Sequence, residues 1–436
     1  MQTESRSEHN VLHWFASLVI FVCLAAISPY SHARSLVPVA NSLALQSRLS
    51  TPEQLLLVAL DAIGEADLDR AENSLRRLLT QQPKYRLARL VYADVLMARS
   101  GRLVDFGSGV VGKRVKSLRD EAQSRVANAQ RLQITAAKLP AFLLRMAPSQ
   151  LRVLVVDVSA ARLYVYRNDH GRAQLEQSLY VSSGKNGGLK RLEGDQRTPV
   201  GVYFLTGTIA ANTLDDFYGP GALPVNYPNE WDLRQGRTGY GIWIHGVPND
   251  TFARAPKASD GCMALSNDNL KSLLRLPQLK NTPVIIANKI EWQDQHTLEQ
   301  RRTRFDKQLL HWREDWESRD VVSYARHYSK HFKAAGKDYQ RWIAHKIKVN
   351  RGKKYIRVAM RDVSVFDYPG EPDLRVVSFS QKYQSNTYSS QSRKRQYWRR
   401  EADGGWRIIF EGPVVLRPEH LRGIPYSARS RISLLD

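Results

Sequence analysis

The spacing of hydrophobic residues separates a helical part of the chain from parts that are rich in strands. Over residues 51–148 the apolar residues recur about every 3.6 positions, as in LLLVALDAIGEADLDRAENSLRRLL, and the sequence TPE at 51–53 has the residue types that begin a helix. From Leu151 the period becomes two, which is typical of strands. We therefore expect an N-terminal α-helical region over residues 51–148 and a central β-rich domain over residues 151–288.

The central domain has the pattern of a sandwich or barrel. LRVLVVDVSAARLYVYRNDHG has the pattern of a strand, a turn and a second strand, and QSLYVSSGKNGG continues as a strand into a glycine loop. Further strands are expected at residues 200–206, 241–245 and 284–288. Short strands separated by loops rich in glycine and proline favour a β-sandwich or barrel.

The C-terminal part combines helices with an antiparallel sheet. A helical linker is expected over residues 290–316, and residues 317–414 hold a further helical stretch followed by three strand-like runs. The last run predicts a hairpin, because ADGG at 402–405 supplies the residues that tight turns need. This order indicates an α+β cone, followed by a C-terminal tail over residues 415–436, so the expected fold is multidomain.

The N-terminus has the composition of an export signal. VLHWFASLVIFVCLAAI at 11–27 is apolar, and SHA at 31–33 places small residues where a signal peptidase cuts, so residues 1–33 are expected to be a signal peptide or a membrane anchor. Either alternative places the rest of the chain in the periplasm or cell envelope. Because Cys23 lies in this leader, Cys262 is the only thiol of the mature chain. It is a reactive thiol, part of an intermolecular bridge, or an inert buried residue.

Part of the helical region resembles a tetratricopeptide repeat. Ala71, Leu75 and Pro83 stand at the offsets of the small, large and terminating positions of such a repeat, and YRLARLVYADVLMARSG resembles the first helix of a following unit. The resemblance covers about one and a half repeats, and isolated repeats are marginally stable. The region is therefore either a plain helical bundle or a repeat that binds a protein partner.

Charge narrows the choice of partners. The chain of 436 residues has a net charge of +23, and residues 301–400 hold 25 Lys and Arg against 10 Asp and Glu. A basic surface of this kind favours polyanions. Behind an export signal these are an anionic wall polymer or a membrane surface rather than nucleic acid, and the alternative is a solvated face with no ligand.

The candidate chemistry centres on Cys262. A thiol becomes a useful nucleophile when a basic partner or backbone dipoles lower its pKa from about 8.5. His245 ends the apolar run GIWIH, so its ring is expected at the sheet edge, where Gly246 allows a sharp turn. Gly261 frees the backbone before the thiol, so the amides of Gly261 and Cys262 are candidate oxyanion donors. The alternative is a structural histidine that is unrelated to the thiol.

Metal and cofactor chemistry is not expected. His245, Asp260 and Cys262 lack the second CxxC or HxxH pair that a zinc site needs, and no cofactor motif was identified.

Four blocks of sequence, in order, resemble the YkuD-type L,D-transpeptidase catalytic domain: GDQRTPVGVYFL, YGPGALPVNYPNEWD, GIWIHG and SDGCMALSNDNL. The resemblance implies a bacterial cell-wall enzyme on a β-rich fold. It assigns Cys262 as the nucleophile, His245 as the general base, and the backbone of Gly261 and Cys262 as oxyanion donors. Ser259 keeps the Ser/Thr position of the family motif, whereas Asp260 replaces its usual second histidine. An aspartate there disfavours the thiolate unless it faces away or pairs with a cation, for which Arg254 and Lys257 are candidates.

The resemblance also implies a reaction and its substrate. The thiolate would attack the carbonyl of the third residue of a peptidoglycan stem peptide, expel the terminal D-alanine, and pass the resulting thioester to an amine acceptor. Hydrolysis of wall peptides by a cysteine L,D-carboxypeptidase or amidase, and a non-catalytic wall-binding scaffold, are the alternatives. Trp243 fits packing within the sheet at least as well as a role in the groove. The substrate-binding candidates are Tyr218, Asn226, Tyr227, Trp231, Ser259 and Asp260.

A second resemblance covers residues 308–414. REDWESRDVVSYARHYSKHF together with QYWRREADGGWRIIFEG resembles SnoaL-like domains, also called nuclear-transport-factor-2-like domains. Such cones often bind ligands or dimerise without catalysis. With the basic surplus, this implies a wall-binding or oligomerising module.

Overall fold

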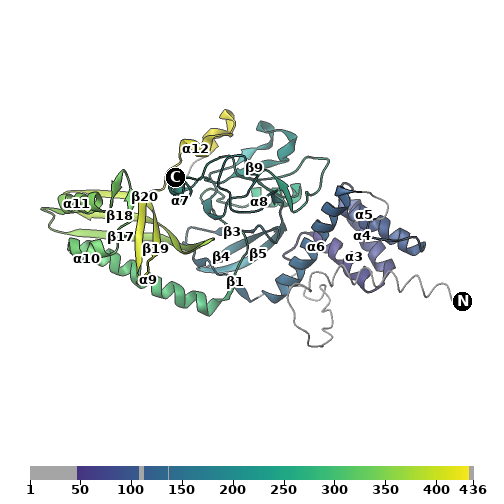
Figure 1. Ribbon diagram of the computed structural model, residues 1–436, viewed down its shortest axis with the longest axis horizontal. Helices are drawn as coiled ribbons and strands as arrows, with labels where there is room; N and C mark the ends of the chain where they lie inside the picture. Colours follow the sequence, from purple (N-terminus) through teal and green to yellow (C-terminus); the bar gives the residue numbers. More distant parts are fainter. Residues whose placement is uncertain (1–46, 108–111, 136, 432–436) are drawn as a thin grey trace.

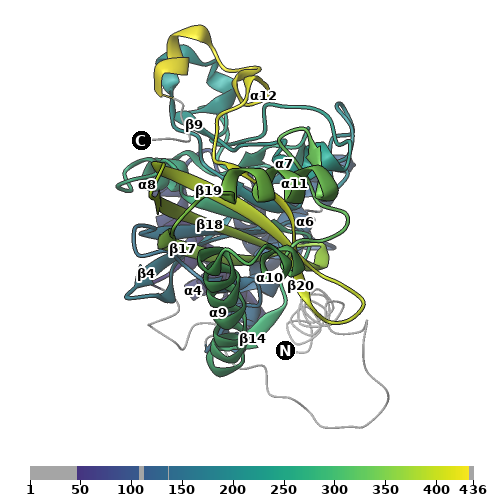
Figure 2. The same cartoon turned by 90° about the vertical axis from the view of Figure 1, so that its left-hand side faces the viewer.

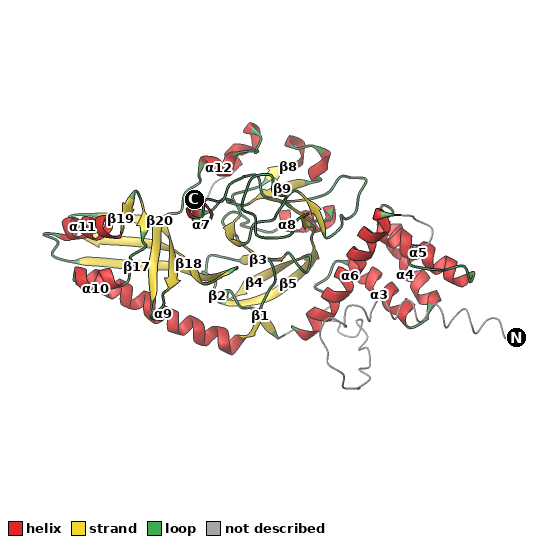
Figure 3. Cartoon of the chain, in the orientation of Figure 1, coloured by secondary structure: helices red, strands yellow, loops and turns green. Residues whose placement is uncertain are grey.

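The computed structural model describes residues 47–107, 112–135 and 137–431. These residues form an elongated molecule, with the helical region at one end, the β-rich domain in the middle and the C-terminal sheet with its helices at the other end (Figure 1). Figure 3 shows the same division by secondary structure. The predicted leader over residues 1–33 lies outside the described residues. Among the described helices, none is long and apolar enough to cross a membrane.

The helical region packs around a shared apolar core that includes Leu56, Leu75 and Val91. Its helices are α3 (Thr51–Gly64), α4 (Leu68–Gln81), α5 (Arg86–Arg99) and α6 (Lys113–Ile134). The expectation of helix throughout residues 51–148 is wrong at its end, where two short strands form instead. β1 (Lys138–Pro140) pairs with β14 (Trp292–Asp294), and β2 (Leu143–Arg145) pairs with a strand of the C-terminal domain.

The central domain is built from two main sheets whose facing sides share one core. The first has the order β5-β4-β3-β13-β7, and the second has the order β12-β10-β9-β8. Leu154 and Ile286 of the first sheet pack in the same cluster as Leu223 and Ile244 of the second. The strands are β3 (Arg152–Asp157), β4 (Arg162–Asp169), β5 (Arg172–Tyr180), β6 (Ser183–Gly184), β7 (Gly201–Phe204), β8 (Ile209–Ala210), β9 (Gly221–Pro224), β10 (Trp243–His245), β11 (Lys257–Ser259), β12 (Met263–Ala264) and β13 (Pro283–Ala287).

Short helices connect these strands. Two single-turn 3-10 helices, η1 (Ala211–Thr213) and η2 (Asp216–Tyr218), lie between β8 and β9. The helix α7 (Glu230–Arg234) follows β9, and α8 (Asn267–Leu274) follows β12. The strands expected at residues 200–206, 241–245 and 284–288 are confirmed as β7, β10 and β13.

The C-terminal domain is a curved antiparallel sheet covered by helices, as expected. The sheet has the order β2-β17-β18-β19-β20, and the last two strands form the predicted hairpin. In Figure 2, α9 lies below the strands β17, β18 and β19, and α11 lies above α10. The elements are α9 (Gln295–Ser318), α10 (Val321–Arg326), β15 (Lys333–Ala334), β16 (Lys337–Asp338), α11 (Tyr339–Asn350), β17 (Ile356–Tyr368), β18 (Glu371–Ser385), β19 (Ser389–Arg400) and β20 (Trp406–Pro413).

The segment after β20 returns to the central domain. It forms α12 (Pro418–Leu421) and η3 (Tyr426–Arg431), and Ile424 packs in one cluster with Ile209, Ala222 and Trp243. The His420 imidazole lies 3.0 Å from the Pro228 carbonyl oxygen. The region expected as a C-terminal tail is therefore, as far as residue 431, a segment packed beside β10.

Candidate active site

The strand pair β10–β12 brings the histidine and the cysteine together. The two strands are parallel, with Ile244 opposite Met263 and His245 opposite Ala264. Because side chains alternate along a strand, this register places His245 and Cys262 on the same face. The expectation that His245 lies at the sheet edge is wrong, because β10 is an inner strand between β12 and β9. His245 is only 1% exposed.

The thiol of Cys262 is held by the backbone of the neighbouring strand. The Trp243 amide donates to Sγ at 3.4 Å, and the thiol donates to the Gly241 carbonyl oxygen at 3.3 Å. The side chain is partly exposed and packs against the cluster of Trp243 and Ile424. The thiol is thus partly exposed, and two hydrogen bonds to the backbone hold its orientation.

Tyr218 connects the histidine and the cysteine. Its ring centroid lies 5.1 Å from that of His245 and 5.2 Å from that of Trp243, and it packs against the same cluster as Cys262. Burial, followed by the charge of the Cys262 thiolate, raises the pKa of Tyr218. Of the predicted substrate-binding residues, Tyr218 is the one that contacts the imidazole.

The imidazole of His245 is neutral and oriented as a base. Its Nδ1 lies 2.7 Å from the Gly246 carbonyl oxygen, which only accepts hydrogen bonds, so we assign the proton to Nδ1. Nε2 then carries a lone pair. Burial lowers the pKa of His245 to about 4, and Arg254 lowers it further, against the opposing effect of the hydrogen bond to Gly246. His245 is therefore unprotonated at neutral pH.

The thiol is protonated in this state, contrary to the expectation of a partly ionised cysteine. Burial raises the pKa of Cys262 to about 11, although the Trp243 amide and the Arg254 charge act in the opposite direction. A neutral thiol beside a neutral imidazole is the starting point for general-base catalysis, in which the proton leaves sulfur as the nucleophile attacks.

Ser259 shapes the turn before the thiol. The Gly261 amide donates to Ser259 Oγ at 3.1 Å, and the Ser259 hydroxyl donates to the Cys262 carbonyl oxygen at 2.6 Å. Gly261 has φ +132°, and a Cβ there would lie 2.7 Å from the Arg197 carbonyl oxygen. The Gly261 amide thus donates to Ser259 in this structure, and the oxyanion roles expected for the Gly261 and Cys262 amides stay predictions.

Asp260 points to solvent and pairs with a cation, though not with either candidate. Its carboxylate accepts from Lys185 Nζ at 2.8 Å and from Gln196 Nε2 at 3.0 Å. The expected ion pair of Asp260 with Arg254 or Lys257 is wrong, because the cation that pairs with this carboxylate is Lys185, the residue after β6. Asp260 still acts to raise the pKa of Cys262.

Three predicted substrate-binding residues lie in the interior. Asn226 accepts from the Phe204 amide at 2.6 Å, and the Tyr227 hydroxyl donates to the Thr238 carbonyl oxygen at 2.8 Å. Trp231 stacks on Tyr397 of the C-terminal domain, with 6.3 Å between ring centroids. All three are buried, so their hydrogen bonds and packing stabilise the fold and none lines a groove.

Two residues beside the imidazole were not predicted as site residues. Phe217 lies 5.9 Å from His245 between ring centroids, and the Arg254 guanidinium lies 4.2 Å above the Phe217 ring. One feature of the sequence points to Arg254, namely its place in the segment between His245 and Cys262. Phe217 had none beyond its position before Tyr218.

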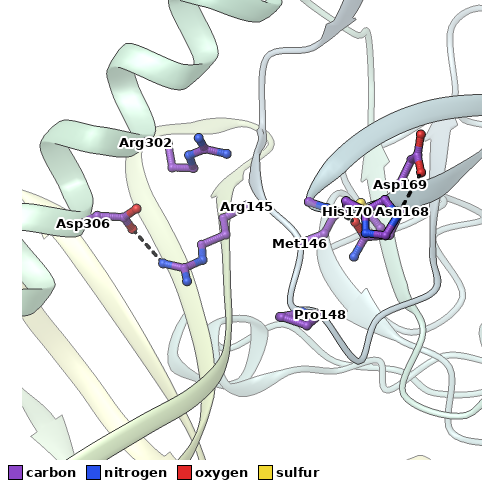
Figure 4. Close-up of a pocket in the computed structure, with 9 residues that line it drawn as sticks. Arg145, Met146, Pro148, Asn168, Asp169, His170, Arg302 and Asp306 are labelled. Carbon is purple, nitrogen blue, oxygen red and sulfur yellow. Dashed lines mark hydrogen bonds and ion pairs between the residues drawn. The ribbon is translucent and has the colours of Figure 1, made fainter.

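Two further cavities contain none of the predicted site residues. One, of about 670 Å³, lies where β2 and the β4–β5 hairpin face α9, and Arg145 pairs there with Asp306 at 3.1 Å (Figure 4). It is lined by Arg145, Met146, Pro148, Asn168, Asp169, His170, Gly171, Arg302 and Asp306. The other, of about 460 Å³, lies in the C-terminal domain between α11 and the sheet and includes Lys346, Lys353 and Lys394.

Comparison with protein families assigns both domains. Residues 151–286 match the model of the L,D-transpeptidase catalytic domain, and residues 304–412 match the model of the Cds6 C-terminal NTF2-like domain. The chain thus carries a YkuD-type catalytic domain, a family that implies peptidoglycan as substrate, followed by an NTF2-like domain. The resemblances to the YkuD-type catalytic domain and to nuclear-transport-factor-2-like domains are confirmed, whereas the resemblance of the helical region to a tetratricopeptide repeat stays a prediction.

Two solved structures are similar to this chain over nearly the whole of their own length. Bd1075 of Bdellovibrio bacteriovorus is 28% identical with a TM-score of 0.57, and the match covers 63% of this chain and 98% of Bd1075. The helical cell shape determining protein Pgp2 of Campylobacter jejuni is 25% identical with a TM-score of 0.53, and the match covers 65% of this chain and 99% of Pgp2. A search among curated proteins found no match.

Proposed function

We propose that the protein is a peptidoglycan L,D-transpeptidase in which Cys262 is the nucleophile and His245 the general base. Sγ attacks the carbonyl of the third stem residue while His245 Nε2 takes the thiol proton. The bond between that carbonyl and the terminal D-alanine breaks, and His245 passes the proton to the departing amine. An acceptor amine then attacks the thioester, its proton returns to sulfur through His245, and a new amide forms.

One observation carries this proposal. The neutral imidazole and the partly exposed thiol lie on one face of two adjacent parallel strands, and Nδ1 of His245 is already engaged with the Gly246 carbonyl. Nε2 is therefore the nitrogen available to the thiol. The match of the domain to the L,D-transpeptidase model supports the same assignment.

The experiment uses a purified disaccharide-tetrapeptide. We expect D-alanine release and an acyl adduct on the peptide that contains Cys262, detected by mass spectrometry. Cys262→Ala should abolish both, and His245→Gln should slow acylation by about 10²- to 10⁴-fold. Carbapenem acylation of Cys262 is the simpler first probe. Absence of both D-alanine release and adduct with the wild-type protein would overturn the proposal.

The second candidate has water as the acceptor, which gives a cysteine L,D-carboxypeptidase. The observation that favours it is Asp260, an exposed carboxylate that stands two residues before Cys262 where the family usually has histidine. Products are compared with and without an added stem amine. Cross-linked dimers that form only with the amine would reject hydrolysis as the main reaction.

We further propose that the protein acts in the cell envelope and contributes to cell shape. The leader predicted over residues 1–33 supports export, and one similar structure is named as a helical cell shape determining protein. A null strain is complemented with the wild-type gene or with Cys262→Ala. A non-catalytic scaffold predicts that both restore morphology, whereas catalysis predicts that only the wild type does.

The NTF2-like domain supports the expected binding of an anionic wall polymer. Its cavity of about 460 Å³ places Lys346, Lys353 and Lys394 around Trp316 and Tyr383. Burial lowers the pKa of Lys346 to about 8, so a bound anion would favour its charged form. We expect salt-sensitive binding to isolated sacculi that Lys353→Gln weakens and Lys382→Gln, on the exposed surface, does not. Binding to anionic vesicles but not to sacculi would favour the membrane surface instead.

A further inference from the structure

The helical region contacts the loop that joins the two predicted catalytic residues. This loop, residues 247–256, leaves β10 after His245 and enters β11 before Cys262. Phe252, near its middle, packs against the core of the helical region, and its ring centroid lies 4.1 Å from that of Tyr85. Lys84 Nζ donates to the Asn249 carbonyl oxygen at 2.9 Å. The loop therefore belongs to the catalytic domain by sequence and packs against the helical region.

Tyr85 is itself fixed by the helices. It is buried, and its hydroxyl donates to Glu121 Oε1 of α6 at 3.1 Å. Arg125, one turn further along α6, donates to the same carboxylate at 2.8 Å and lies 3.9 Å above the Tyr180 ring. The Tyr180 hydroxyl in turn donates to the Arg254 carbonyl oxygen at 2.9 Å. The helical region thus holds the loop both at Phe252 and at Arg254.

Arg254 belongs to this loop, and its positively charged guanidinium lies near the candidate active site. Its guanidinium lies over Phe217 at 4.2 Å and donates to the Phe217 carbonyl oxygen at 3.4 Å, and Phe217 lies beside His245. A cation over an aromatic ring is attracted to it, which keeps the guanidinium on this side of the loop.

Several charged groups act on the thiol. Arg254 and Lys190 favour the thiolate and Asp260 opposes it, while Tyr218 and His245 are neutral near pH 7. Lys190 is tied to Asp195 at 2.8 Å, and Asp260 is tied to Lys185 at 2.8 Å. Arg254 is the cation among them whose loop contacts the helical region.

We propose that the helical region is a positioning element of the active site: Tyr85 fixes Phe252, and Phe252 fixes the loop so that the Arg254 guanidinium stays over Phe217, beside His245 and Cys262. The positive charge there stabilises sulfur as it loses its proton. Phe252 and Tyr85 are positioning residues, because they act through Arg254. The consequence for turnover rests on the proposed function, whereas the consequence for the thiol does not.

The test measures the rate at which iodoacetamide alkylates Cys262 in the full chain, without any substrate. Only the thiolate reacts, so below the pKa of the thiol a rise of one unit in that pKa slows alkylation about tenfold. The modified peptide that contains Cys262 is quantified by mass spectrometry. We expect Arg254→Gln to slow alkylation about threefold to tenfold at about pH 9.

A double-mutant comparison tests the coupling. Phe252→Ala should slow alkylation in the same direction as Arg254→Gln, and the double variant should be no slower than Arg254→Gln alone. Phe252→Tyr, which keeps a ring, should restore the wild-type rate. Phe252→Leu serves as the milder variant if Phe252→Ala does not fold.

The control is Leu75→Ala, which removes a fully buried side chain from the core of the helical region, whereas Phe252 is a partly buried residue of the loop. It should lower the melting temperature and leave the alkylation rate of the folded protein unchanged. Additive slowing in the double variant, faster alkylation of Phe252→Ala, or equal slowing by Leu75→Ala would overturn the positioning role. An inactive wild-type protein that shows the expected coupling would overturn the proposed function alone.

Discussion

At the scale of single residues, the site pairs two groups that are both neutral in the resting state. His245 is buried under Tyr218 and beside Phe217, which disfavours imidazolium, and the protein around Cys262 disfavours thiolate. An ion pair formed in advance would need the opposite shifts in both pKa values. In the proposed mechanism the proton therefore moves from sulfur to the imidazole during the attack on the substrate.

This arrangement predicts a broad pH profile. The reactive form has a neutral imidazole, so kcat/KM should fall as the pH drops through about 4 and should change little between there and the thiol pKa of about 11. D-alanine release is measured across this range, with alkylation of Cys262 as the substrate-free comparison. A bell-shaped profile with an acid limb near the ordinary pKa of histidine, about 6.5, would contradict it.

Asp260 offers a second prediction at this scale. Asp260→Asn removes a negative charge that raises the pKa of Cys262, so alkylation at about pH 9 should become about twofold to threefold faster. The exposed pair with Lys185 is also lost, which should cost less than about 1 kcal/mol of stability. Lys185→Gln is the matched control for the pair alone. An unchanged or slower rate in Asp260→Asn would show that the carboxylate does not act on the thiol.

The sequence predicted that His245 and Cys262 lie close together, but it did not predict which residues surround them. The motifs around His245 and Cys262 predict the pair because local strand patterns and glycines bring them to adjacent strands. Burial could not be predicted in the same way. Asn226 and Trp231 lie in matching blocks and yet face the interior, since their partners, Phe204 and Tyr397, belong to other strands.

At the scale of secondary structure, the long elements and the strands β7, β10 and β13 were predictable, whereas β1 and β2 were not. The helices to Ile134 and the long strands β17–β20 have enough residues to show their period. β1 and β2 have three residues each and exist because β14 and β17, far along the chain, supply their hydrogen-bonding partners. No local pattern could separate them from the end of a helical region.

Helix α3 carries the charged group that ties the helical region to the catalytic domain. Glu53 accepts from Arg162 Nη1 of β4 at 3.0 Å and pairs with Arg125 of α6 at 3.3 Å, and all three side chains are buried. Burial acts to raise the pKa of Glu53, but the two guanidiniums outweigh it and hold the pKa below 4.5.

Glu53→Gln should therefore destabilise the protein strongly. It leaves two buried guanidiniums without this carboxylate, and losing one partner of a buried pair costs about 3–5 kcal/mol. Urea denaturation at neutral pH measures the loss, with Glu65→Gln as the control because its pair with Arg70 is exposed.

The effect also has a pH signature. The stability that Glu53 contributes is fully present above its unfolded pKa of about 4.5 and is lost as the pH falls through its lower folded pKa. Wild type and Glu53→Gln should thus converge in stability under acid. A loss as small as that of Glu65→Gln would contradict the role of this network.

At the scale of the whole molecule, the described parts are joined by buried polar contacts as well as by packing. Glu230 of α7 accepts from the Tyr397 hydroxyl at 3.0 Å and from Arg395 at 3.3 Å, both on β19 of the NTF2-like domain. These groups are buried, so separating the domains would leave charges without partners. We interpret the catalytic and NTF2-like domains as one cooperative unit.

The segment after β20 gives the prediction at this scale. Ile424→Asp places a carboxylate in the apolar cluster with Ile209, Ala222 and Trp243, which costs several kcal/mol unless the segment moves away. We expect a lower melting temperature, a changed tryptophan emission and faster alkylation of Cys262. Tyr426→Asp, at a position that is 87% exposed, should change none of these. Equal effects of the two substitutions would show that the segment is not packed as described.

That segment also sets an order of events during biosynthesis. Ile424 is translated long after the strands that it covers, so the wall beside Trp243 is open while the nascent chain already contains both His245 and Cys262. A chain interrupted before α12 keeps every group that the proposed chemistry needs and still lacks the apolar residues of this segment that pack in the same cluster as Cys262. The catalytic face is therefore completed only after the segment that carries Ile424 has been translated.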